Sequence, residues 1–329
     1  MKSYLVCLVA AWSVMAAVPS FADAPIIIKF SHVVAKDTPK GKAAEKFKEL
    51  AEAATKGKVK IEIYPNSTLY KDKEELEALQ LGAVQMLAPS LAKFGPLGIK
   101  EFELFDLPFI FADKKALAKI TEGPIGRDLL NKLDAKGILG LAYWDNGFKM
   151  MSSNRPIHVP ADMKGLKMRI QASKVLDEQM RVLGANPQVM AFSEVYQALQ
   201  TGVVDGAENP PSNLYTQKMH EVQKHLTVTN HGYIGYAVIV NKKFWDKLPA
   251  DVRTQLESAM REASKYANTI AQQENDRALE AVKKAGTTTV YVPNEKEKAA
   301  WQAALLPVQK TMEDRIGKEL IAAVNKATH

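Results

Sequence analysis

The feature that most constrains the fold is an alternation of short β-branched runs with longer amphipathic runs, which begins at Pro25. The run IIIKFSHVV (26–34) predicts a strand, and KVKIEIYP alternates with the period of two that a half-buried strand requires. Between them, Thr38 and Pro39 supply the N-cap and the first-turn proline of a helix. Strands that alternate with helices indicate an α/β fold.

The same order of elements then starts again, which predicts a second lobe. The first half contains a helix at 73–81, a strand in VQMLAPS, helices at about 113–121 and 124–135, and a strand at 138–144. The second half contains strands around FKMMSS and LKMRI, a helix at 173–183, a strand at 188–190, a helix at 193–201 and a strand in VVDGA. We therefore predict two lobes of similar construction.

Two short segments repeat one another within this pattern, ALQLGAVQMLAP at 78–89 and ALQTGVVDGAENP at 198–210. Each predicts a helix, a turn and a strand, followed by a loop that contains Ser90 in one half and Asn209 in the other. If the lobes face each other, Ser90 and Asn209 lie on opposing walls of one cleft. A chance repeat also stays open, because short helices that end in glycine are common.

Two elements are long enough to join the lobes. The glycine-punctuated run HGYIGYAVIVN (231–241) predicts a strand that passes from one lobe to the other, and the run from Pro249 to about Ala285 predicts a helix about 50 Å long that braces both. We assign 23–146 and about 235–275 to lobe I, and 147–234 and about 276–329 to lobe II.

The first 22 residues have the pattern of a cleaved secretory signal peptide. Lys2 precedes an apolar run of about 15 residues, and Ser20 and Ala22 provide the small residues of a cleavage site. A transmembrane anchor is the alternative, but a span needs roughly 20 apolar residues. Cys7, the one cysteine of the chain, lies inside this segment, so we expect a mature protein without disulfides, cysteine nucleophiles or thiolate metal ligands.

Charge and motifs argue against several functions. The formal net charge of +7 comes from lysines scattered among acids, without the basic runs and interleaved aromatics of a nucleic-acid-binding protein. The sequence contains no nucleophile elbow, zincin motif, phosphate-binding loop or dinucleotide fingerprint, and its histidines lack metal-ligand spacing. We therefore expect neither an enzyme nor a cofactor nor a metal site.

Two polar residues at strand ends are the strongest site candidates. Arg169 ends the apolar strand LKMRI; it is either a solvated edge residue or an anion clamp, because a guanidinium presents a fork of donors that matches a carboxylate. Asn209 follows a strand and precedes two prolines; it is either the N-cap of the next helix or a ligand-binding amide.

Lysines and aromatic residues near these strands form a second group of candidates. Lys36, Lys93 and Lys149 follow apolar runs, although most lysines are solvated surface residues. Four aromatic side chains are either core residues or walls of a pocket: Trp144, Phe192, Tyr233 and Tyr236.

Several of these segments together carry a resemblance to a known family. They are KFSHVVAKDTPKGKAAEKF, DMKGLKMRI, LGANPQVMAFSEVYQALQTGVVDGAENPPSN and YTQKMHEVQKHLTVTNHGYIGYAVIVN, in this order across the mature chain. The sequence resembles the extracytoplasmic solute-binding proteins of TRAP transporters, in the branch that binds C4-dicarboxylates.

The resemblance implies a fold and a site. It implies two α/β lobes, crossing strands and a bracing helix, which close on a ligand held in the cleft. The family's carboxylate-clamping arginine corresponds to Arg169, its cleft asparagine to Asn209 and its aromatic pocket wall to Phe192. Where the sialic-acid branch has a second arginine and a glutamate, this chain has Lys149 and Ser90, which argues against a large sugar acid.

The resemblance also implies a function. We expect a periplasmic receptor that binds succinate, fumarate or malate and delivers it to TRAP membrane permease subunits, with Tyr236 among the pocket residues and Lys36 or Lys149 as the cation for the second carboxylate. A monocarboxylate or a sugar acid such as a uronate is the rival ligand. A periplasmic hydrolase or lyase on a similar scaffold is the rival class.

Overall fold

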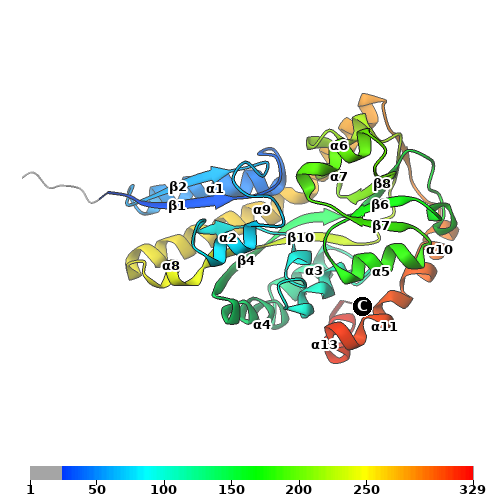
Figure 1. Cartoon of the computed structure of the whole chain (residues 1–329). Helices are drawn as coiled ribbons and strands as arrows, with labels where there is room; N and C mark the ends of the chain where they lie inside the picture. The colour runs from blue at the N-terminus through cyan, green and yellow to red at the C-terminus, as the bar shows by residue number, and fades with distance from the viewer. Residues whose placement is uncertain (1–23, 329) are drawn as a thin grey trace, which may run out of the picture.

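The computed structural model describes residues 24–328 and contains two β-sheets (Figure 1). The predicted signal peptide, residues 1–22, lies outside the described residues. The first sheet has the strand order β2-β1-β3-β10-β4 and forms the centre of the first lobe. Its strands are β1 (Ile26–Ser31), β2 (Val59–Tyr64), β3 (Met86–Leu87), β4 (Ile138–Phe148) and β10 (Tyr233–Asn241). The first three are mutually parallel, whereas β10 runs antiparallel to β3 and β4.

The second sheet has the order β11-β9-β5-β8-β6-β7 and forms the centre of the second lobe. Its strands are β5 (Met150–Ser153), β6 (Lys167–Ile170), β7 (Asn186–Val189), β8 (Gly206–Asn209), β9 (His225–Thr227) and β11 (Thr289–Tyr291). In Figure 1 the blue and cyan elements of the first lobe and the green elements of the second lie on opposite sides of the molecule. The predicted two-lobed α/β fold is confirmed.

Helices cover both sheets. Those of the first lobe are α1 (Pro39–Ala54), α2 (Glu75–Gln80), α3 (Lys114–Thr121), α4 (Pro124–Lys132) and α8 (Lys242–Asp246), with 3₁₀ turns η1 (Leu91–Lys93), η2 (Lys100–Asp106) and η3 (Leu133–Lys136). Those of the second are α5 (Lys174–Val182), α6 (Val195–Gln200), α7 (Pro211–Thr216) and α10 (Glu295–Leu305), with η4 (Pro160–Met163), η5 (Phe192–Glu194) and η6 (Met219–Glu221). None of the helices within 24–328 is long and apolar enough to cross a membrane.

Helix α1 forms where the sequence predicts it. The Thr38 hydroxyl accepts a hydrogen bond from the Gly41 N–H, and Pro39 occupies the first turn, where its missing N–H has no intrahelical partner to lose. Phe47 and Ala51 are fully buried on the face that packs against the sheet. The N-cap at Thr38 and the apolar face therefore both predict the helix that the structure contains, and the cap fixes its first turn.

Two of the crossings of the chain between the sheets lie next to each other. The chain leaves the first sheet where β4 ends at Phe148 and enters the second at Met150, and it returns between β9 and β10 through residues 228–232. The backbone N–H of Lys149 donates to the Gly232 carbonyl at 2.8 Å, which ties the two crossings together. The expectation that 231–241 itself spans the lobes is wrong, because β10 pairs along its whole length within the first sheet.

Helix α9 (Ala250–Ala285) is the predicted brace. Its 36 residues correspond to about 54 Å. It packs against α1 and β4 in the first lobe and against α7 in the second. The Asn275 amide touches both lobes, because it donates to the Asn146 carbonyl after the middle of β4 and accepts from the Ser212 N–H of α7 at 3.0 Å.

The C-terminal helices differ from the expected lobe assignment, which placed all of 276–329 in lobe II. Helix α10 does pack on the second lobe, with Trp301 in its core. Helices α12 (Glu313–Ile316) and α13 (Lys318–Thr328), which follow α11 (Pro307–Thr311), instead contact η2 and α3. Their apolar side chains, Ile316 and Val324 among them, complete the core of the first lobe.

Candidate functional site

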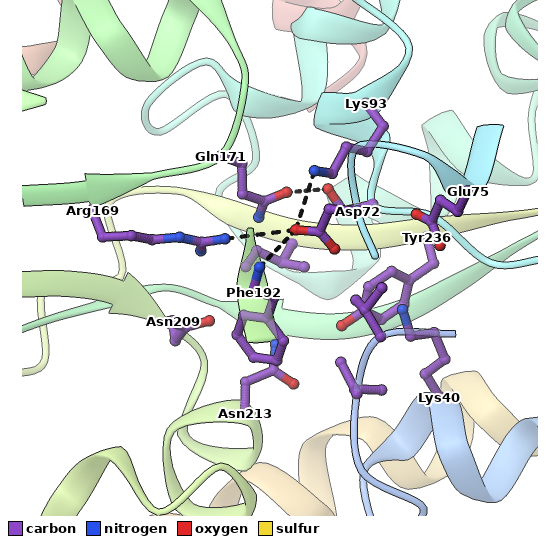
Figure 2. Close-up of a pocket in the computed structure, with 14 residues that line it drawn as sticks. Lys40, Asp72, Glu75, Lys93, Arg169, Gln171, Phe192, Asn209, Asn213 and Tyr236 are labelled. Atoms are coloured by element: carbon purple, nitrogen blue, oxygen red, sulfur yellow. Dashed lines mark hydrogen bonds and ion pairs between the residues drawn. The ribbon is translucent and has the colours of Figure 1, made fainter. Parts of the chain in front are cut away.

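A pocket with an empty volume of about 350 Å³ lies between the lobes (Figure 2). The first lobe contributes Val33, Val34, Lys40, Asp72, Glu75, Ser90, Lys93, Ile234 and Tyr236, and the second contributes Arg169, Gln171, Phe192, Asn209 and Asn213. The pocket therefore combines an apolar wall with an unusual number of charged side chains.

Ser90 and Asn209 both line this pocket from opposite lobes. Ser90 follows β3, Asn209 ends β8, and the Ser90 hydroxyl is hydrogen-bonded across the cleft to the side-chain oxygen of Gln171. The geometric prediction drawn from the repeated segments, that their two loops meet at one cleft, is confirmed.

Arg169 is held rigidly at the pocket wall. It lies in β6 and is only 2% exposed, so it is not a solvated edge residue. Its Nε and Nη2 donate to the carbonyl of Met190 at 3.1 and 2.8 Å, and its guanidinium carbon lies 5.6 Å from the centre of the Phe192 ring. Two bonds to one carbonyl fix the guanidinium plane and leave the remaining donors available to the pocket.

Asp72 is the polar centre of the pocket, and nothing in the sequence singled it out, because YKDKEELE has the pattern of a solvated turn. Its carboxylate lies 3.2 Å from the Lys93 ammonium and 3.8 Å from Arg169, and it accepts from the Phe192 N–H at 2.9 Å (Figure 2). Burial opposes ionisation, but Lys93, Arg169 and the Phe192 N–H outweigh burial and lower the pKa of Asp72. Asp72 is therefore an ionised side chain that contacts both lobes.

Lys40 and Glu75 are two further buried titratable residues, and the sequence pattern was not used to predict either. The Lys40 ammonium donates to the Ala88 carbonyl at 2.9 Å and lies 3.7 Å from the centre of the Tyr236 ring, which is a favourable place for a cation. Lys40 precedes the buried Phe47 by seven residues, and Glu75 precedes the buried Leu79 by four, so helical spacing puts both on apolar faces. This helical spacing is the sequence signal from which the burial of both side chains could have been predicted.

Lys36, one of the two lysines predicted to bind the second carboxylate, is exposed and does not line the pocket. It precedes the N-cap of α1, and the helix carries Lys40 rather than Lys36 into the interior. The assignment of Lys36 to the pocket is wrong, and the lysines that line it are Lys40 and Lys93.

Lys149, the other predicted cation, is buried in a separate ion-pair network in the second lobe. Its ammonium lies 2.6 Å from a carboxylate oxygen of Glu208, whose other oxygen contacts His231 at 2.8 Å and Gln179 at 3.1 Å. Glu208 and Asn209 are neighbours on β8, so their side chains point to opposite faces of the sheet, and only Asn209 lines the pocket. Lys149 therefore pairs with Glu208 on the far side.

The partners in this network stabilise the ionised form of Glu208. Burial disfavours the Glu208 carboxylate, but Lys149 and the bond from His231 outweigh burial and lower its pKa to about 2. The ring of His231 also bonds to the Thr229 hydroxyl at 2.6 Å. Three residues of this network, Lys149, Thr229 and His231, lie in the two crossings between the lobes.

The remaining predicted residues, Phe192 and Tyr236, do line the pocket. The Tyr236 hydroxyl and the side-chain oxygens of Asn209 and Asn213 are buried without a hydrogen-bond partner among the described residues. Buried polar atoms are normally paired, so these three mark places where a polar ligand would bond. Within 24–328 no group of three or more metal-ligating side chains is present.

Comparison with known proteins gives the family. Residues 30–315 match the family model of the bacterial extracellular solute-binding proteins, family 7 (DctP). The C4-dicarboxylate-binding periplasmic protein DctP of Rhodobacter capsulatus is 68% identical over 97% of this chain and 95% of its own length. A TRAP periplasmic solute-binding protein of Sulfurospirillum deleyianum, solved with bound succinate, is similar with a TM-score of 0.90 and 46% identity over 93% of this chain and all of that one.

A second solved structure supports the same assignment. A TRAP periplasmic solute-binding protein of Pseudomonas aeruginosa with bound L-malate has a TM-score of 0.85 and 45% identity, over 87% of this chain and all of that one. The predicted family is thus confirmed by sequence and by structure: this chain belongs to family 7 of the bacterial extracellular solute-binding proteins, the DctP family.

Proposed function

We propose that this protein is a periplasmic receptor that captures a C4-dicarboxylate, such as succinate, fumarate or malate, and delivers it to the membrane permease of a TRAP transporter. The observation that carries the proposal is that cations from both lobes line one buried pocket: Arg169 from the second, Lys40 and Lys93 from the first. A ligand with a carboxylate at each end would pair with both sides.

The remaining lining of the pocket supports a small ligand. Phe192 and Ile234 offer apolar surface for a short carbon chain, and the unpaired oxygens of Asn209, Asn213 and Tyr236 suit a hydroxyl or carboxylate. The ligands named for the succinate-bound and malate-bound relatives have this form.

The mechanism that we propose is closure of the lobes around the ligand. A ligand that pairs with Arg169 and with Lys93 makes its full set of contacts only when both lobes meet it, so it favours the closed form. The family is one of binding receptors rather than enzymes. We further propose that residues 1–22 direct export to the periplasm, where the closed form docks on the permease.

Isothermal titration calorimetry with succinate, fumarate and malate tests the ligand class, with butyrate as the monocarboxylate control and galacturonate as the sugar-acid control. We expect the dicarboxylates to bind at least 100-fold more tightly than butyrate, because butyrate leaves one cluster of buried cations unpaired. Absence of heat with all three dicarboxylates would overturn the proposal. Recovery of altered ligand by mass spectrometry would instead favour the hydrolase or lyase alternative.

A further inference from the structure

The charges that line the pocket do not match a dianion if every group is ionised. Lys40, Lys93 and Arg169 contribute three positive charges, and Asp72 and Glu75 contribute two carboxyl groups. With both carboxyls ionised the lining carries a charge of +1, whereas with one of them protonated it carries +2. Which carboxyl holds the proton therefore decides how well the pocket complements the ligand.

Asp72 has the partners that an ionised carboxylate requires. Lys93 lies 3.2 Å away, Arg169 lies 3.8 Å away, and the Phe192 N–H donates to it. A buried carboxylate with two cations and a backbone donor stays charged.

Glu75 lacks such partners. It is the first residue of α2 and is 1% exposed. Its Oε2 has no hydrogen-bond partner among the described residues, and no lysine or arginine nitrogen of the described chain lies within the 4.0 Å of an ion pair. An unpaired carboxylate in a buried site is strongly disfavoured relative to the neutral acid.

The charged and titratable groups around Glu75 are committed to other contacts. Lys40, from α1, is bonded to the Ala88 carbonyl and lies over the Tyr236 ring of β10, and Lys93, from η1, pairs with Asp72. Burial and the negative charge of Asp72 raise the pKa of Glu75 well above its usual range, against the smaller opposing effects of Lys40 and Lys93. Geometry and electrostatics thus agree on the neutral form.

We propose that Glu75 determines the charge specificity of the pocket by carrying a proton in the liganded state, so that capture of a dicarboxylate dianion is accompanied by uptake of one proton at this side chain. The inference rests on the proposed function. Above the pKa of Glu75 in the free protein, the dianion and one proton join a protein with ionised Glu75 to give a complex with neutral Glu75. Below that pKa, Glu75 is already neutral and the dianion binds without proton uptake. The neutral acid offers the ligand a donor, whereas the ionised form repels it.

The direction of the pH dependence follows. Two added negative charges favour the protonated form, so the pKa of Glu75 is higher in the complex than in the free protein. Affinity is complete below the pKa of the free protein and falls as the pH rises through it, by up to about tenfold per pH unit. Succinate itself is fully ionised throughout this range, so its own titration does not contribute.

Calorimetry with succinate between about pH 7 and pH 9, in buffers of different ionisation enthalpy, counts the protons taken up. For the parent protein we expect uptake that rises toward about one proton per succinate, and an affinity that falls by at least about tenfold. Burial lowers the pKa of Lys40 to about 8, so Lys40 also titrates in this range. In the double variant Lys40→Met/Glu75→Gln neither group can ionise, and uptake and the pH dependence should both disappear. Glu77→Gln, exposed on the same helix, is the matched control and should behave as the parent.

Lys40→Met tests whether the proton is taken up by Lys40 or by Glu75. We expect it to bind succinate more weakly and to retain the uptake. Uptake that disappears in Lys40→Met alone, uptake that persists in Lys40→Met/Glu75→Gln, or a parent that binds succinate at pH 9 without uptake would overturn the inference and leave the proposed function intact. No binding of any dicarboxylate to the parent would instead overturn the proposed function.

If Lys40→Met/Glu75→Gln fails to fold by circular dichroism, the parent still provides the test. The carboxyl carbon of Glu75, observed by NMR in glutamate-labelled protein, should show the neutral acid at pH 7.5 in the succinate complex. The chemical shift of an ionised carboxylate there would contradict the assignment.

Discussion

The carboxylate of Asp72 in the first lobe accepts a hydrogen bond of 2.9 Å from the backbone N–H of Phe192 in the second. Two exposed contacts join the same lobes nearby: Lys71 with Glu194 at 3.2 Å and Asn66 with Gln217 at 3.3 Å. The structure is therefore a closed form, and Asp72 and Phe192 themselves line the pocket.

Spin labels at Lys71 and Glu194 should report the closure. With Cys7 replaced by Ser and both positions changed to Cys, we expect succinate to increase the population of short label distances in double electron–electron resonance. Labels at Glu49 and Lys58, exposed within the first lobe, should keep one distribution. Identical distributions with and without succinate for the first pair would contradict ligand-driven closure.

Arg169→Lys should weaken succinate binding by about 100-fold, or roughly 3 kcal/mol. A lysine ammonium cannot reproduce the planar fork that both bonds to the Met190 carbonyl and faces the pocket. The measurement is calorimetric. Arg181→Lys, exposed on α5, is the control and should bind as the parent. An affinity within threefold of the parent for Arg169→Lys would refute the clamp.

Lys93→Met and Lys36→Met should behave differently. Lys93 lines the pocket and balances Asp72, so its loss leaves a buried acid facing the ligand, and we expect at least about a 30-fold loss of succinate affinity. Lys36 is exposed and outside the pocket, so its removal should change affinity less than twofold. Equal effects of the two changes would restore Lys36 as a ligand residue.

Lys149→Met should chiefly destabilise the fold. The Glu208 carboxylate would be left buried without its cation, which costs about 3–5 kcal/mol in the free energy of unfolding measured with urea. Adding Glu208→Leu should recover a large part of this loss, because the pair is then replaced by apolar contacts. A Lys149→Met protein of parental stability that no longer binds succinate would show instead that Lys149 contacts the ligand.

Acid should destabilise the protein partly through Glu208. Its pKa is lowered in the folded state to about 2, so its stabilising contribution is complete above the unfolded value of about 4.5 and is lost as the pH falls toward 2. Between pH 6 and pH 3 this amounts to ~2 kcal/mol. Urea denaturation of Glu208→Gln should show a correspondingly smaller loss over that range, whereas the exposed Glu45→Gln should follow the parent.

The sequence predicted the fold more completely than the charges of the site. Periodicity and caps located α1, α9, the strands of the first sheet and β5 to β8 of the second, because local apolar spacing and burial coincide there. The repeated segments placed Ser90 and Asn209 at one cleft because strand direction follows from the order of elements. Arg169 was found because a charge at the end of an apolar strand is conspicuous.

The partners of the buried lysines could not be assigned from local pattern. Lys149 and Lys40 are both fully buried, but one pairs with Glu208 and the other lies over Tyr236, and these partners come from distant parts of the chain. The C-terminal helices were misplaced for a similar reason, because an amphipathic helix does not encode which lobe supplies its partner surface. In each case the position was determined by contacts with residues that are distant in the sequence.

The two hydrogen bonds of Asn275, to Asn146 and to Ser212, make it a candidate pivot for the proposed closure. Because one amide holds a backbone group of each lobe, a closure that pivots at Asn275 would move nearby residues little and would move exposed residues such as Lys71 and Glu194 far. Such a pivot would separate Arg169 from Lys93, which line the pocket from opposite lobes.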